Sequence, residues 1–136
     1  MPRLFGLNPV GALLAAVVFF VIGHLWYNLL FQDVWLAAQG LTVQQVQREF
    51  DFWLVGGFLI TLVQVIGLGL VMRWRGVSSI GAAALTAFVL WLVFALPFAH
   101  YAYIYSQDHN PAVLMVDASH LLAGWVAAAV VLAVMK

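Results

Sequence analysis

The chain has 136 residues, of which 66% are hydrophobic and 7% are charged, and its five basic and five acidic side chains leave no net charge. A soluble domain typically carries about 25% charged residues, so this composition excludes an ordinary soluble domain, and the balanced charge gives no indication of nucleic-acid binding. Because there is no cysteine, disulfides, thiolate metal sites and thiol catalysis are excluded as well.

Four apolar segments fill almost the whole chain. Each holds the ~20 apolar residues that an α-helix needs to cross the hydrocarbon of a bilayer. We therefore predict an all-α, polytopic membrane protein, a single domain over residues 1–136 that forms a four-transmembrane-helix bundle in the lipid bilayer. The predicted helices span residues 10–31, 43–72, 79–105 and 111–135.

The first helix follows Asn8 and Pro9, a capping residue and a proline at a first helical position. Its apolar run is longer than the core of a signal peptide, so we expect it to be retained. Ala12 and Ala16 have the small-residue spacing that permits close helix contact. At the end of this helix, Trp26 and Tyr27 form the aromatic belt expected at a membrane surface.

The second helix has a clear predicted start. Gly40 is placed to end a preceding short turn, and Thr42 with Gln45 forms a capping-box pattern. A helix from Val43 to Met72 would be about 45 Å long, so its first turns should project beyond the hydrocarbon. The short turn after it predicts that the second and third helices pack as antiparallel neighbours.

The last two helices carry their own signals. Pro97 removes a backbone hydrogen bond from the third helix and predicts a kink. Pro111 is placed to start the fourth helix. Gly124 and Ala128 predict a tightly packed face on that helix.

Basic residues give the orientation. Arg3, Arg73, Arg75 and Lys136 lie at the two termini and in the turn between the second and third helices. Because basic residues favour the cytoplasmic side, we expect a multi-pass protein of a bacterial inner membrane with cytoplasmic N- and C-termini.

Two blocks of the chain resemble a family of small bacterial membrane proteins known as domain-of-unknown-function family 1761. The family pattern resembles G-x-x-W-Y, a phenylalanine, a tryptophan, and then G-L-T or G-L-S. The first block here is Gly23-His24-Leu25-Trp26-Tyr27-Asn28, Phe31, Trp35 and Gly40-Leu41-Thr42. The second is Trp91, Phe94, Pro97 and Val116-Asp117-Ala118. The resemblance implies a four-helix fold and no established activity. The chain departs from the pattern at Asn28-Leu29, where a Ser-Pro step is common, and at His120, where an aromatic residue is expected.

Ionisable residues inside a bilayer are costly and by default face the bundle or a cavity. Counted from the outer helix ends, His24, His100, His120 and Asp117 all lie roughly 8–12 Å below the outer surface. Asp117 and His120 are three residues apart and can hydrogen-bond. Two further polar residues also lie within predicted spans. Asn28 comes four residues after His24, and Gln64, near the middle of the second helix, is expected to donate a hydrogen bond to a neighbouring helix.

This layer has several possible roles. His24, His100, His120 and Asp117 could bind a metal ion. Two histidines from different helices could hold a haem. A histidine–aspartate chain could also carry protons, or these side chains could satisfy one another in a polar plug.

The chain contains none of the common enzyme motifs, such as H-E-x-x-H, G-x-S-x-G or a glycine-rich phosphate loop. The favoured hypothesis, which the small-residue faces and the scarcity of soluble mass support, is a non-enzymatic bundle that self-associates as a homo-oligomer or serves as an accessory subunit of a membrane complex. The alternatives are a membrane binding or transport protein and a haem or metal protein, each using the histidine and aspartate residues in the outer half of the bundle.

Overall fold

The computed structural model describes residues 2–136, and for residues 46–53 it describes the backbone alone. Four helical stretches in this range are long and apolar enough to cross a membrane, namely Pro9–Leu30, Leu54–Trp74, Ile80–Tyr105 and Pro111–Val134. The predicted all-α fold class is confirmed. In chain order the elements are α1 (Pro9–Leu25), the π-helical turn η1 (Trp26–Leu30), α2 (Gln32–Gln39), α3 (Val43–Trp74), α4 (Ile80–Leu90), the π-helical turn η2 (Trp91–Ala95), α5 (Leu96–Tyr105) and α6 (Pro111–Val134).

The start of α3 follows from its local sequence. Gly40 ends α2 with a positive φ of 66°, a conformation that glycine adopts without steric cost. The Thr42 hydroxyl accepts from the Gln45 backbone N–H, and the Gln45 side chain accepts from the Thr42 N–H. The predicted capping box at Val43 is therefore confirmed. With 32 residues, α3 is about 48 Å long and exceeds the ~30 Å of hydrocarbon.

Two π-helical turns interrupt stretches that were predicted as continuous α-helix. In η1 the N–H of Phe31 donates to the carbonyl of Trp26, and in η2 the N–H of Leu96 donates to the carbonyl of Trp91. Each is a bond across five residues instead of four. The second turn ends just before Pro97, so the residue that lacks an N–H lies where the hydrogen-bonding pattern changes.

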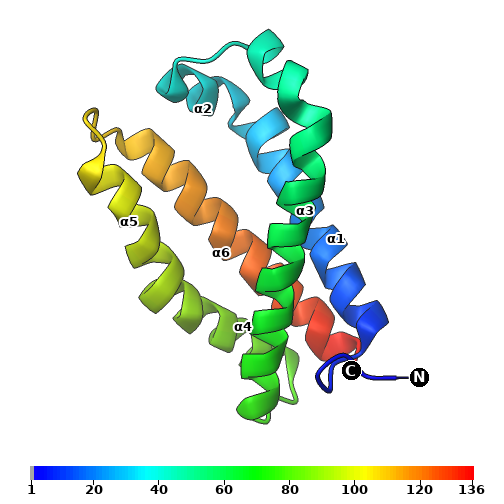
Figure 1. Ribbon diagram of the computed structural model, residues 1–136. Helices are drawn as coiled ribbons and strands as arrows, with labels where there is room; N and C mark the ends of the chain where they lie inside the picture. The colour runs from blue at the N-terminus through cyan, green and yellow to red at the C-terminus, as the bar shows by residue number, and fades with distance from the viewer. Residues whose placement is uncertain (1) are drawn as a thin grey trace.

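Helix α6 occupies the centre of the arrangement. It packs chiefly against α1 on one side and α4 on the other, and α3 packs mainly against α1 (Figure 1). The expectation that the second and third helices would be packed neighbours is wrong, because α3 and α4 contact each other little despite the short turn between them. Their buried side chains, such as Val65 and Ala83, instead join a core that α1 and α6 share.

The hydrophobic core lies in the half of the molecule that holds both termini. Its largest fully buried side chains are Phe19 and Val65, and most of the rest are alanines on α1, α4 and α6. A Cβ atom at Gly124 would lie 2.4 Å from the Phe19 ring, so this glycine allows α1 and α6 to approach closely. Asn8 ties the two ends together, since its Nδ2 donates to the carbonyl of Met135 at 2.7 Å.

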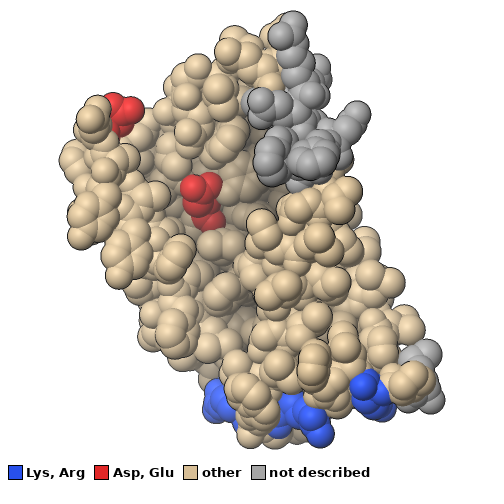
Figure 2. Space-filling view, in the orientation of Figure 1, with Lys and Arg blue, Asp and Glu red and all other residues tan. Residues whose placement is uncertain are grey.

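Basic side chains gather at this same end (Figure 2). Arg3, Arg73 and Lys136 line one pocket there, and Nη1 of Arg73 donates to the carbonyl of Phe5 at 2.8 Å. Large apolar side chains are exposed along all four long helical stretches, which is the surface expected of a protein in lipid.

Replacing Gly124 by alanine should destabilise the protein by about 1–3 kcal/mol, because the new methyl group must displace the buried Phe19 ring. Thermal unfolding in detergent micelles measures the loss. Gly67→Ala is the matched control on a helix, since a Cβ at Gly67 meets no atom within 4 Å. If both variants unfold at the wild-type temperature, the close approach of α1 and α6 is not required.

Candidate functional site

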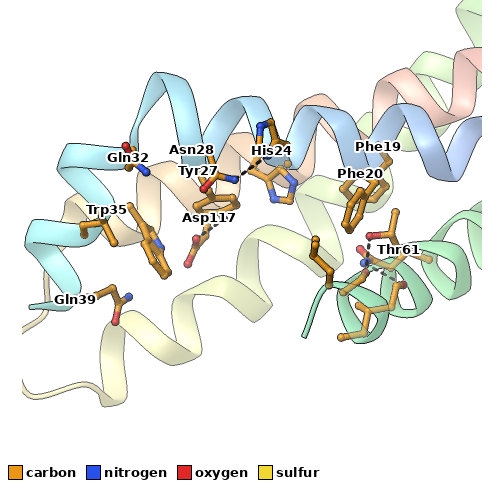
Figure 3. Close-up of a pocket in the computed structure, with 17 residues that line it drawn as sticks. Phe19, Phe20, His24, Tyr27, Asn28, Gln32, Trp35, Gln39, Thr61 and Asp117 are labelled. Carbon is orange, nitrogen blue, oxygen red and sulfur yellow. Dashed lines mark hydrogen bonds between the residues drawn. The ribbon is translucent and has the colours of Figure 1, made fainter. Parts of the chain in front are cut away.

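The half of the molecule opposite the core contains a cavity of about 620 Å³. Residues of α1, η1, α2, α3 and α6 line it. Figure 3 shows the labelled side chains in order from Trp35 and Gln39 at one end, through Tyr27 and Asp117, to Phe19 and Thr61 at the other. The lining is mostly apolar, and its polar side chains are His24, Tyr27, Asn28, Gln32, Gln39, Thr61, Gln64, Asp117 and His120.

Two tryptophans position the part of α6 that lines this cavity. Trp26 Nε1 donates to Oγ of Ser119 at 2.9 Å, and Trp91 Nε1 donates to the carbonyl of Ala118 at 2.8 Å. Each tryptophan is the first residue of a π-helical turn. The two indoles thus hold consecutive residues of α6, immediately beside Asp117.

The carboxylate of Asp117 accepts a hydrogen bond from the hydroxyl of Tyr27, from Oη to Oδ1 at 2.5 Å. The sequence suggested His120 as its partner, and the structure gives it Tyr27 of η1 instead. Asp117 also lines a second cavity of about 250 Å³ between α2, α5 and α6, and Gln39 lines both cavities as well. The carboxylate therefore stands where two cavities meet.

The half-buried His120 ring lies between two aromatic rings. Its centroid is 5.0 Å from that of Tyr27 and 5.5 Å from that of Phe19. Within the described residues, its Nε2 atom is buried and has no hydrogen-bond partner. Gly23 faces this atom, since a Cβ at Gly23 would lie 3.1 Å from it. The Nε2 atom is therefore packed against α1, and the His120 ring must turn for this atom to face a molecule inside the cavity.

The other predicted polar residues have partners. Asn28 Nδ2 lies 3.0 Å from His24 Nδ1, so the amide donates and the imidazole accepts in this arrangement. Gln64 was expected to donate to a neighbouring helix. Its Oε1 instead accepts from Trp125 Nε1 of α6 at 2.9 Å, and its Nε2 donates to the Ile60 carbonyl of its own helix.

The structure brings together three of the four ionisable residues that were predicted to lie at one depth. His24, His120 and Asp117 line one cavity. His100 of α5 is not among the residues that line it, and its Nδ1 lies 2.7 Å from the Leu96 carbonyl. Among the described side chains, no three histidine or acidic residues are close enough together to hold one metal ion. The metal and haem hypotheses stay predictions.

Sequence reasoning missed two of the site's aromatic residues. Tyr27 was interpreted as part of an aromatic belt at the membrane surface, and Trp35 was noted for the family pattern alone. Their rings pack edge to face with centroids 5.6 Å apart, and both line the cavity. The W-Y pair was the available signal, but η1 decides where the tyrosine points.

A family model described as "Protein of unknown function (DUF1761)" matches residues 10–133. The chain belongs to this family. No curated protein and no solved structure matches it. The resemblance seen in the sequence is thereby confirmed, and all residues that line the cavity fall within the matched range.

Residues of the family pattern make the hydrogen bonds that hold α6. The tryptophan and tyrosine of the first block, Trp26 and Tyr27, are the two residues that bond Ser119 and Asp117 of α6. The second block supplies Trp91, which bonds Ala118. Both blocks therefore converge on one short stretch of α6.

The Tyr27–Asp117 contact can be tested by a double-mutant cycle. Tyr27→Phe and Asp117→Asn should each lower the free energy of unfolding by about 1–3 kcal/mol, because each leaves a half-buried polar group with a lost or weakened partner. The double variant should lose about 1 kcal/mol less than the sum. Reversible unfolding in mixed micelles gives the four free energies.

Tyr105→Phe, at a tyrosine that is 80% exposed, serves as the control in a second cycle with Asp117→Asn and should be additive. Additive losses in the Tyr27 cycle would contradict the contact.

Proposed function

We propose that this family member is a membrane-embedded binding protein whose cavity holds a small amphiphilic molecule. The observation that carries the proposal is the cavity of about 620 Å³, whose lining includes His120, a residue with a buried Nε2 that has no partner in the described part of the chain. Ligand cavities typically measure about 300–1,000 Å³ and combine apolar walls with a few placed polar groups. Leaving a buried polar atom unpaired costs about 1–3 kcal/mol, which a ligand's polar group would offset.

The packed core supports binding over passage through the protein. Phe19 lies at the inner end of the cavity and is 2% exposed. Beyond it the alanine-rich core fills the half that contains the termini. A molecule that enters the cavity therefore meets a close-packed interior and stops there.

Self-association or an accessory role in a membrane complex stays a prediction. It rested on small-residue faces, and these now have a use inside the chain. Ala12, Ala16 and Ala128 are at most 1% exposed within the single chain, and the Phe19 ring packs against Gly124. The cavity therefore supports the binding hypothesis more strongly than these faces support an oligomer.

The distribution of charge supports a placement in a bacterial inner membrane with both termini in the cytoplasm. Described basic residues gather at the end that holds the termini (Figure 2), and basic residues favour the cytoplasmic side. In this orientation the cavity lies in the outer half of the membrane.

Reporter fusions test the orientation. A cytoplasm-active reporter fused after Lys136 should be active, and the same reporter inserted in the turn at residues 108–110 should be inactive. An export-dependent reporter at the same two sites is the control and should give the opposite pattern. An active export-dependent reporter at Lys136 would overturn the proposed orientation.

Filling the cavity should weaken binding. Gly57 lines the cavity, and Gly57→Leu would place a side chain in it. We expect 1-decanol to bind the wild-type protein in phosphatidylcholine nanodiscs and to raise its unfolding temperature. With Gly57→Leu the stoichiometric binding should fall at least about tenfold, a loss of about 1.4 kcal/mol.

Gly56→Leu is the matched control, since Gly56 is the adjacent helical glycine, does not line the cavity and has open space around it. If decanol binds both variants and the wild type equally, or binds none of them above empty nanodiscs, the proposed function is wrong.

A further inference from the structure

We infer that the cavity selects amphiphiles whose head group is a protonated amine, held between Asp117 and His120. This inference rests on the proposed function and names the chemical class of its ligand. It is carried by three features of the described residues. These are the charge of the cavity wall, the two acceptors one helical turn apart, and the aromatic rings around them.

Among the described side chains, the cavity wall carries an acid without a lysine or arginine beside it. Asp117 is the acidic residue among the described residues that line the larger cavity, and that lining includes no lysine or arginine. The smaller cavity that Asp117 also lines likewise includes no basic side chain among its described residues. A carboxylate in a membrane protein is normally paired, and Tyr27 satisfies only one of its acceptor positions. A cationic head group would complete the pair.

The two histidines of the cavity can act as acceptors. Nδ1 of His24 lies 3.0 Å from Nδ2 of Asn28, an amide nitrogen that donates. Nε2 of His120 is buried without a partner in the described part of the chain, and a turn of the ring would direct it into the cavity that His120 lines. A neutral imidazole can present this nitrogen as an acceptor.

The spacing of the two acceptors favours an amine with N–H groups. Asp117 and His120 are three residues apart on α6, so their Cβ atoms are about 5–6 Å apart on one face. An ammonium group has three donors and can donate to both side chains at once. A quaternary ammonium has the charge but no donor and can satisfy Asp117 alone.

Aromatic rings and apolar walls complete the fit. Tyr27 and Trp35 line the cavity with their rings nearly perpendicular, at an interplanar angle of 76°, and ring faces attract cations. Phe20, Leu54 and Ile60 supply apolar wall for an alkyl tail. Figure 2 shows acidic atoms at a hollow on the side of the molecule, away from both ends, which suits entry from the lipid.

Binding of four probes with the same ten-carbon chain tests the inference. The probes are decylammonium, decyltrimethylammonium, 1-decanol and decanoate, each titrated into the full chain in neutral phosphatidylcholine nanodiscs and counted by native mass spectrometry. Empty nanodiscs and the Gly57→Leu variant correct for partition into lipid. Decylammonium should bind about tenfold more tightly than decanol, the usual worth of a charge-assisted hydrogen bond, and decanoate should bind most weakly.

Two substitutions separate the roles of the acceptors. With Asp117→Asn the preference for decylammonium over decanol should shrink to about twofold or less, as expected when a charged acceptor becomes neutral. With His120→Phe the preference for decylammonium over decyltrimethylammonium should disappear. Asp33→Asn, at an exposed residue of α2 that lines neither cavity, is the matched control and should keep both preferences.

The comparison of probes on the wild-type protein decides the matter even if a variant does not fold. Equal binding of the four probes, or tightest binding of decanoate, would overturn the ammonium inference. If decanol still binds in a way that Gly57→Leu blocks, the proposed binding function survives that result. If none of the probes binds in a cavity-dependent way, both fail together.

Discussion

Two indole hydrogen bonds hold the stretch of α6 on which the candidate site is built. Trp26 and Trp91 come from opposite sides of α6 and donate to Ser119 and to the carbonyl of Ala118. Such bonds are directional and inside a membrane have few competing partners. They fix both the rotation and the height of the helix, so that Asp117 and His120 face the cavity. The Tyr27–Asp117 contact and the placement of His120 between two rings depend on this rotation.

The molecule divides into a packed half and a hollow half. In the packed half, alanines and Gly124 bring the helix backbones together, and Phe19 and Val65 fill the remaining space. In a membrane such packing is a main source of association between helices, because lipid offers little hydrophobic drive. The packed half can therefore stabilise the fold while the other half keeps a cavity with polar groups inside it. This division lets a chain of 136 residues combine a stable fold with an open site.

The sequence predicted those features that depend on length, composition and local capping. The apolar runs set the four spans, the Thr42–Gln45 pattern set the start of α3, and counting from the helix ends grouped His24, His120 and Asp117, which line one cavity. It did not predict the hydrogen-bond partner of Asp117, nor that His100 lies apart from the cavity lined by the other three residues. Both depend on helix rotation, which η1 and η2 change by hydrogen bonds that no local residue pattern announces. The expectation that α3 and α4 pack together was wrong for a related reason, since a short turn constrains the helix ends and not the packing of their faces.

The π-helical turns also bear on how sequences of this family can tolerate length changes. Each turn holds one residue more than the α-helix around it, and one residue corresponds to a rotation of about 100°. Deleting a single residue within Trp26–Leu30 would let the segment relax to an ordinary α-helix. Because the π-helical turn absorbs that residue, Trp35 and Gln39 of α2 would keep their direction toward the cavity, and the side chains of the turn itself, such as Tyr27, would change theirs. The same deletion in α6, which has no such turn, would instead disrupt a regular helix. In this protein natural insertion or deletion at η1 could thus change the part of the cavity wall that Tyr27 and Asn28 supply, without changing how the rest of the chain crosses the membrane.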